Sequence, residues 1–425
     1  MIAICEPQCK SFSHEKFNSG FIYGLRLAYP QDKLLFYADL SHIDAIKRIW
    51  KWNGIDIGDI EYIPIKFQDT GSPGAFIQYC FLFHRIFSDM AVLGLDKLFL
   101  LSFNSQNLYV IKRLKQCQKF SDIKFTLVCH GVFEAIADDR GERMSLQYVE
   151  KRSIIERIRK AGWVGLPRKV INVIKGRYDA VVAYWNDICW KWLPFKKILL
   201  WRQSADFKYI LLATQAIVNV RKYIDVKNFN FYTVVLPTIF SEAVPRGRNE
   251  HVKFAVFGYG YSAMLQKVLA CLSTKKLNSS YEIRIIGMDG RGTEGFPNIT
   301  CPSAGRPMSR EEMEKNVTDI DMFLILYDKG LYKLTCSGSL IEALSYVKPI
   351  LHFDNDCINT FNKKENPIGI CCDSVESMAA VMEGIINNYS GYVPKLEGYR
   401  NNMLALRKQV AIENNLQQLR DSFTW

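Results

Sequence analysis

Short apolar runs recur along the chain of 425 residues, and amphipathic stretches with helical spacing separate them. The runs are rich in β-branched and aromatic residues and are apolar without alternation, which is typical of strands covered on both faces. Strands of this kind that alternate with helices predict an α/β protein built on parallel sheets. In the first half of the chain the pattern predicts strands at 1–5, 33–39, 61–65, 97–103, 125–131, 180–185, 209–214 and 232–237.

A polar segment with Pro and Gly, 241–252, interrupts this pattern and is typical of a linker. A chain of this length also favours two domains over one core. We therefore predict domains at 1–244 and 245–395, and a C-terminal helix within 396–425 that packs back toward the first domain. The second series predicts strands at 253–258, 281–287, 298–305, 322–327, 348–353 and 368–373, with helices at 262–272, 309–317, 339–347, 374–389 and about 396–420.

The net charge of +12 indicates an anionic partner, which could be a nucleotide, a nucleic acid or a membrane surface. Twelve cysteines are scattered without a CxxC pair, which predicts a reducing compartment. The N-terminus lacks a basic segment followed by an apolar one, so we expect no signal peptide. No apolar run approaches the length of about 20 residues that crosses a bilayer. These features predict a cytoplasmic protein.

Small polar residues stand directly before the helix predicted at 339–347, in the stretch "TCSGSL". Ser337, Gly338 and Ser339 leave room for a ligand near the backbone, and the start of a helix offers unpaired N–H groups to an anion. Glu342 falls one turn into this helix. An ordinary N-cap explains the same residues, since Ser begins many helices. Gly258 and Gly260, in "FGYG", stand at a second strand-to-helix turn of the same kind.

The second half resembles the donor-binding domain of nucleotide-sugar glycosyltransferases with the GT-B fold, most of all retaining bacterial enzymes that build polysaccharides. The matching pieces follow in order: "FAVFGYG" (254–260), "IRIIGMDG" (283–290), "SREEMEKNVTDIDMFLILY" (309–327) and "SGSLIEALSYVKPIL" (337–351). The resemblance implies two Rossmann-like domains facing across a cleft, with a nucleotide-diphosphate sugar as the donor substrate. It also implies an O-antigen or capsule type of pathway and a hexosyltransferase that needs no cofactor.

Within that resemblance, Gly258, Gly260, Ser337, Gly338 and Ser339 would surround the diphosphate. Glu342 would accept hydrogen bonds from the ribose hydroxyls. Many retaining relatives carry an earlier glutamate at a fixed spacing, and that position here is Leu334. Asp328 and Lys329 are the nearby candidates for its role, although neither stands at that spacing. Cationic compensation of a departing diphosphate could come from Lys267, Arg306, Arg310 or Lys333, of which Arg306 and Lys333 stand in the proposed loops.

Candidate acceptor-side residues follow strands of the first half. We expect the segment 14–25 to form a loop in which His14, Asn18 and Gly20 contact a substrate. His130 ends the strand predicted at 125–131 and could bind a hydroxyl or act as a base. An ordinary structural histidine would fit the position as well. Glu134 and Glu15 are acidic base candidates, which an inverting enzyme would need and a retaining one would not.

The region 151–201 mixes many basic residues with Trp, Leu and Ile. This composition fits an interfacial segment at the inner face of the plasma membrane, and hence a lipid-linked glycan acceptor. A basic surface helix over an ordinary core is the alternative. The histidines do not cluster and no HExxH occurs, so we expect no metal site.

Two other functions remain open from the sequence. A nucleotide-sugar epimerase shares the two-domain architecture, but it would need several acids and bases and no membrane surface. A nucleic-acid-binding protein would suit the charge, but no zinc finger or RNP-like motif supports it.

Overall fold

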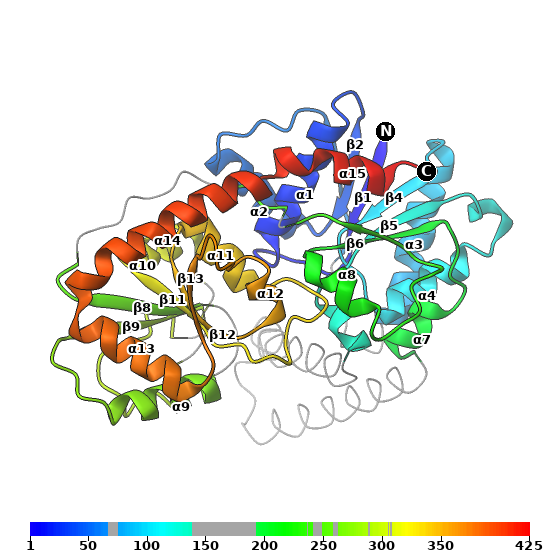
Figure 1. Cartoon of the computed structure of the whole chain (residues 1–425). Coiled ribbons are helices and arrows are strands. Elements are labelled where there is room, and N and C mark those ends of the chain that lie inside the picture. The colour runs from blue at the N-terminus through cyan, green and yellow to red at the C-terminus, as the bar shows by residue number, and fades with distance from the viewer. Residues whose placement is uncertain are drawn as a thin grey trace, which may run out of the picture. The chain divides into compact units, whose positions relative to one another are not determined.

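The computed structural model describes residues 1–66, 75–137, 193–235, 237–240, 249–257, 262–287, 290–304, 306 and 308–425. The chain forms two compact units, Met1–Ile239 with Ile412–Trp425, and Phe240–Ala411 (Figure 1). The strand expected at 180–185 and the boundary expected at 244 lie outside the described residues.

The first unit is built on a seven-stranded parallel sheet with the order β3-β2-β1-β4-β5-β6-β7. Its central strand β1 pairs with β2 and β4, and all five of its residues are buried, as expected for a strand covered on both faces. The strands are β1 (Ile2–Glu6), β2 (Leu34–Ala38), β3 (Ile60–Pro64), β4 (Lys97–Leu100), β5 (Lys124–Val128), β6 (Phe207–Leu211) and β7 (Asn230–Thr233).

The strand order of the first sheet reverses between β1 and β4. Because parallel crossovers are right-handed, helices α1 and α2 cover one face of the sheet, and α3 and α4 cover the other (Figure 1). α1 also packs on the C-terminal helix α15, and α4 packs on α7. The helical elements are α1 (Glu15–Ala28), α2 (Leu40–Trp52), α3 (Ala75–Val92), α4 (Ser105–Leu114), η1 (Gln118–Phe120), η2 (Gly131–Ile136), α7 (Phe195–Leu200), α8 (Thr214–Val220), η3 (Ile412–Asn415) and α15 (Leu416–Phe423).

Buried lysines close the carboxyl ends of helices in this unit. Lys112 is only 2% exposed, and its Nζ donates to the carbonyls of Ile198, Leu199 and Trp201 at 3.1, 2.8 and 2.7 Å. These carbonyls lie at the negative end of α7, where a cation is favourable. Burial nevertheless lowers the pKa of Lys112 to about 7. Lys208 donates in the same way to the carbonyl of Asp421 in α15 at 2.9 Å. Part of the positive charge is thus used inside the fold.

The second unit holds a six-stranded parallel sheet with the order β10-β9-β8-β11-β12-β13. The strands are β8 (Val252–Phe257), β9 (Tyr281–Ile286), β10 (Ile299–Thr300), β11 (Met322–Ile325), β12 (Ile350–Phe353) and β13 (Gly369–Cys372). The helices are α9 (Ser262–Ser273), α10 (Arg310–Val317), α11 (Gly338–Tyr346), α12 (Asp356–Asn359), α13 (Val375–Asn387) and α14 (Tyr389–Val410).

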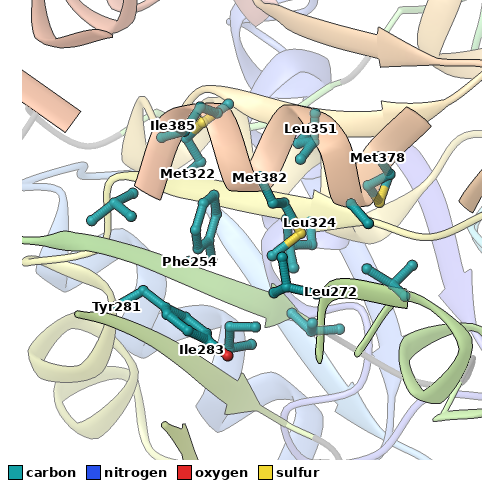
Figure 2. Packing of buried hydrophobic residues seen from close by; sticks show 14 of the residues in the cluster. Phe254, Leu272, Tyr281, Ile283, Met322, Leu324, Leu351, Met378, Met382 and Ile385 are labelled. Atoms are coloured by element: carbon teal, nitrogen blue, oxygen red, sulfur yellow. The ribbon is translucent and has the colours of Figure 1, made fainter. Parts of the chain in front are cut away.

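The core of this unit lies between the sheet and helices α9 and α13. Met378 and Met382 from α13 face Phe254, Leu324 and Leu351 from three neighbouring strands (Figure 2). All five side chains are at most 2% exposed, so their burial contributes to stability through the hydrophobic effect. The apolar runs seen in the sequence are therefore the strands of two cores.

Two expectations about helices need correction. The segment 14–25 is not a loop: it belongs to α1, whose buried positions include Phe17, Phe21 and Leu25 at a spacing of four residues. The final helix is not continuous over 396–420, because α14 ends at Val410 and Ala411 has an extended ψ of 143°. α15 then begins at Leu416.

Among the described helices, none combines the length and the apolar character needed to cross a bilayer.

Candidate functional site

A buried carboxylate organises the carboxyl edge of the first sheet. Glu6, the last residue of β1, is 1% exposed. Its Oε1 accepts hydrogen bonds from the backbone N–H groups of Gln8 and Cys9 at 2.8 and 3.1 Å, and from the hydroxyl of Ser102. Its Oε2 accepts from Nδ2 of Asn18 at 3.1 Å. Four donors compensate the cost of burying this charge and tie the loop after β1, helix α1 and the end of β4 to one point.

The side-chain amide of Asn18 also fixes the tautomer of a buried histidine, His42. Nδ2 of Asn18 also lies 2.9 Å from Nε2 of His42, and Nδ1 of His42 lies 3.0 Å from the carbonyl of Ser11. Since the amide nitrogen can only donate, Nε2 accepts and the proton of His42 sits on Nδ1. Within this network Nε2 of His42 thus serves as the acceptor for Asn18.

Two histidines predicted from the sequence come together at this edge. His14 immediately precedes α1, His130 follows β5, and their ring centroids are 4.8 Å apart at an angle of 73°. The backbone of His14 is left-handed, with φ 54°, a conformation that a histidine adopts at a cost. Phe17 packs on the ring of His130, with the two centroids 4.2 Å apart. The strained turn holds the exposed His14 over the half-buried His130.

His130 is held as a neutral imidazole. Burial lowers its pKa well below the ordinary value, nearby His14 lowers it further, and a hydrogen bond to the Leu101 carbonyl opposes the change. Its Nε2 is buried and has no hydrogen-bond partner among the described residues. The unpaired nitrogen can accept a hydrogen bond from a substrate hydroxyl, whereas the lowered pKa disfavours full transfer of a proton to the ring.

The other acceptor-side predictions lie in helical segments. Asn18 and Gly20 are buried inside α1 rather than exposed in a loop. A Cβ on Gly20 would lie 2.0 Å from the carbonyl oxygen of Pro237, so this glycine allows close packing. These positions do not favour contact with an acceptor. Glu15 and Glu134 are half-buried in α1 and η2, and their role as bases stays a prediction.

A chain of hydroxyl groups organises the carboxyl edge of the second sheet. Ser337 caps α11 by accepting from the N–H of Leu340 at 3.2 Å, and its own hydroxyl donates to the phenol of Tyr327 at 3.1 Å. Tyr327 donates to Ser339 at 2.7 Å. Ser339 donates to the carbonyl of Phe257, the last residue of β8, at 2.8 Å. The carbonyl can only accept, so every hydroxyl in the chain points the same way, an arrangement that strengthens each bond.

This chain gives the hydroxyls of Ser337 and Ser339 a role within the protein, and the place of both residues beside a donor diphosphate stays a prediction. Their hydroxyls are bound within the protein, and the two residues are 0% and 9% exposed. Burial raises the pKa of Tyr327, against the effect of its hydrogen bonds. The chain joins the ends of β8 and β11 to the start of α11. What it can offer a ligand is the backbone of the first turn, which begins at the exposed Gly338.

Two further residues predicted near the donor lie around this turn, together with Leu334. Glu342 is half-buried one turn into α11, and Lys333 is half-buried in the segment before it. Leu334, at the position of the earlier family glutamate, is 0% exposed. A fully buried leucine cannot take the place of a sugar-binding carboxylate. Gly258 and Gly260 lie outside the described residues.

The loop after β11 is fastened from the neighbouring strand. Nδ2 of Asn355 donates to the carbonyls of Asp328 and Leu331 at 2.8 and 2.9 Å. Lys329 forms an ion pair with Asp354 at 2.6 Å. These contacts hold the loop that leads to Lys333 and α11.

Arg306 pairs with a carboxylate of its own unit. Its guanidinium bonds to both carboxylate oxygens of Glu312, with one contact at 2.9 Å. Glu312 also closes the capping box of α10 with Ser309. The pair lowers the pKa of Glu312 to about 2, with the Arg306 hydrogen bond as the main cause. Arg306 is 56% exposed, so it could still turn to an anionic ligand.

Glu6, His42 and Tyr327 were not predicted from the sequence. Glu6 ends β1 and Tyr327 follows β11, and this position at the carboxyl edge of a parallel sheet was the available signal. Of the region 151–201, only 193–201 is described. Within the described part of the chain, no three His, Cys, Asp or Glu side chains are grouped so as to hold a metal ion.

Two glycosyltransferases are among the solved structures that align with nearly the whole chain. A glycosyltransferase from Rickettsia africae ESF-5 aligns with a TM-score of 0.55 at 10% identity, over 100% of this chain and 99% of that one. The apo form of the lipopolysaccharide outer core galactosyltransferase WaaB aligns with a TM-score of 0.53 at 10% identity, over 99% and 98%. No family model and no curated protein matches the chain. The chain has the GT-B fold, and the prediction of two Rossmann-like units is confirmed.

Proposed function

We propose that the chain is a glycosyltransferase that moves a sugar from a nucleotide-diphosphate sugar to a glycan. The observation that carries this proposal is the start of α11, fixed by the Tyr327 chain at the carboxyl edge of the second sheet. Ligands of α/β proteins bind beyond this edge, and the first turn of a helix binds anions through its N–H groups. The GT-B fold shared with two transferase structures supports the proposal.

The donor diphosphate would lie against the first turn at Gly338. Glu342 would accept hydrogen bonds from the ribose, and Lys333 and Arg306 would compensate the charge of the leaving nucleotide. With these groups the transfer would need no metal and no cofactor. The hexose would move with retention of its anomeric configuration.

The acceptor would bind at the carboxyl edge of the first sheet. His14 is the exposed member of the histidine pair, so an acceptor hydroxyl would meet it before His130. If the transfer inverts the anomeric centre, His14, His130, Glu134 or Glu15 would remove the acceptor proton.

A lipid-linked acceptor in surface polysaccharide synthesis is the acceptor class that we favour. One aligned structure is a lipopolysaccharide outer core galactosyltransferase, which suits a membrane-bound glycan. Such an enzyme would work in the cytoplasm at the inner face of the plasma membrane. Neither aligned structure favours the epimerase alternative.

Calorimetric titration with UDP, GDP, ADP, CMP and their nucleotide sugars tests the donor site. We expect selective binding of one nucleotide, unchanged by a metal chelator. No binding to any of them would refute the proposal. Incubation of the bound nucleotide sugar without acceptor then distinguishes the alternative, because an epimerase would convert the sugar while a transferase would leave it intact or hydrolyse it slowly. Proton NMR of the transfer product would show retention or inversion.

A further inference from the structure

Helices α3 and α7 expose large apolar side chains to solvent. Ile77 and Phe81 of α3 are 59% and 73% exposed, and they stand four residues apart on one face of the helix. Leu200, at the end of α7, is 44% exposed. Single exposed apolar residues are common, but here they lie on helices that pack together through α4 (Figure 1).

A row of aromatic rings connects these helices. Phe76 of α3 lies 6.1 Å from the ring of Tyr109 in α4, and Tyr109 stacks on Trp201 at 5.2 Å with an interplanar angle of 21°. Arg113 lies over both Tyr109 and Trp201, 5.5 Å from each ring, and Arg202 lies 5.3 Å from Trp201. Tyr and Trp with flanking cations are the residues that favour the headgroup layer of a membrane.

The charge of this surface is mainly positive. The segments 75–88, 105–114 and 195–204 contain no Asp or Glu, whereas Arg113, Lys197 and Arg202 are exposed. The one acidic residue of α3, Asp89, lies near the end of the helix and forms an ion pair with Arg85.

Leu200 directly precedes Trp201 and the exposed Arg202. Ile77 and Phe81 stand on α3, which packs on α4, the helix of Arg113. Apolar side chains that would enter the acyl boundary and cations that would meet lipid phosphates therefore lie on neighbouring elements.

We propose that this surface docks the protein on an anionic lipid bilayer. We call it the aromatic basic face and define it by Ile77, Phe81, Tyr109, Arg113, Trp201 and Arg202. The helices lie flat in the interface rather than crossing it. An acidic protein partner is disfavoured, because isolated aliphatic side chains next to arginines match a layered partner with phosphates above hydrocarbon. The inference does not rest on glycosyl transfer, since docking requires neither nucleotide nor acceptor.

Vesicle flotation of the full chain tests the proposal. One vesicle preparation holds phosphatidylcholine alone, and the other holds phosphatidylcholine and phosphatidylglycerol in equal parts. We expect binding to the second preparation only, and weaker binding as salt is added, because salt screens the arginines. No binding by the wild-type chain, or equal binding to both preparations, would overturn the proposal.

Two double variants locate the contact. Arg113→Gln with Arg202→Gln should weaken binding to anionic vesicles by roughly fivefold for each cation removed. Ile77→Ser with Phe81→Ser should weaken it at every salt concentration. The matched controls alter exposed residues around α8 and should bind as the wild type does. One control combines Arg221→Gln with Lys227→Gln, and the other is the single change Val218→Ser.

Thermal unfolding by circular dichroism confirms that each variant is folded. Full vesicle binding by either double variant would refute the assignment of the face. Sedimentation without lipid tests the other possible occupant, a second copy of the chain. If the wild type is a dimer and the variant with Ile77→Ser and Phe81→Ser is a monomer, the face binds a second copy and the proposal is wrong.

Discussion

The phenol of Tyr327 and the hydroxyl of Ser339 lie 2.7 Å apart, and this bond joins strand β11 to the start of helix α11. Both oxygens belong to one chain of hydrogen bonds that begins at a helix amide and ends at the last carbonyl of β8. The chain is buried, so each of its members has lost water and depends on the others. The first turn of α11 is therefore set by Tyr327, a residue that would touch no ligand itself.

Replacement of Tyr327 by Phe should loosen that turn. Two buried serine hydroxyls lose a partner, which we expect to reduce the free energy of unfolding by about 1–3 kcal/mol. Donor affinity should fall by roughly tenfold, because the amides of the turn are no longer held in place. Titration calorimetry and urea unfolding measure the two effects.

The control is Tyr389→Phe, which removes another buried phenol bond. Tyr389 donates to Asp321 at 2.7 Å at the amino end of the same strand β11, away from the proposed donor edge. It should lose similar stability and keep its donor affinity. Equal loss of affinity in both variants would mean that Tyr327 acts on overall stability alone.

Replacement of Glu342 by Ala should weaken the binding of the nucleotide while the chain stays folded, because the side chain is only half-buried. Loss of a charge-assisted bond to a ribose hydroxyl predicts a drop of about tenfold in affinity. Glu376→Ala is the matched control, since Glu376 is an exposed glutamate in the first turn of α13 in the same unit. If Glu342→Ala binds the nucleotide as tightly as the wild type, the residue does not belong to the donor site.

The sequence predicted the fold well, because its apolar runs are short, rich in β-branched and aromatic residues and separated by helical patterns, which favours strands covered on both faces. Helix α1 was missed, because Asn18, Ser19 and Gly20 are poor helix formers and obscured the spacing of Phe17 and Phe21. Asn18 is a polar residue on a buried face because its amide donates to the buried carboxylate of Glu6.

The candidate sites were predicted only in part. Small residues before α11 predicted the turn that leads into this helix, but a sequence cannot show that the hydroxyls of Ser337 and Ser339 are bound to Tyr327. The pairing of His14 with His130 was equally hidden, because it depends on a left-handed turn and on two strands that are far apart in the chain.

Replacement of His14 by Asn should separate catalysis from folding. Asn tolerates the left-handed backbone at this position, so stability should change little. If His14 handles the acceptor proton or hydroxyl, the transfer rate should fall by about 100-fold while donor affinity is kept. His84→Asn, at an exposed histidine on α3, serves as the control. Unchanged transfer by His14→Asn would limit the histidine pair to a structural role.

A buried histidine should make the second unit sensitive to acid. Nδ2 of Asn362 lies 2.7 Å from Nε2 of His352, and the Asn362 Oδ1 accepts from the N–H of Ile368, which fixes the amide orientation. Nε2 of His352 is therefore an acceptor, and Nδ1 carries the proton toward the Phe353 carbonyl. Burial lowers the pKa of His352 to about 4 from 6.5.

Because the folded pKa is the lower one, the unfolded chain takes up a proton first as the pH falls. The stability linked to His352 is complete above pH 6.5 and is lost between pH 6.5 and about 4. Between about pH 7 and about pH 5 this amounts to about 2 kcal/mol, measurable by urea unfolding at both values. His352→Gln should flatten this part of the pH dependence, whereas His84→Gln should leave it as in the wild type. A profile that stays as steep in His352→Gln would assign the acid sensitivity to other groups, of which His130 at the edge of the first sheet has a pKa shifted in the same direction by burial.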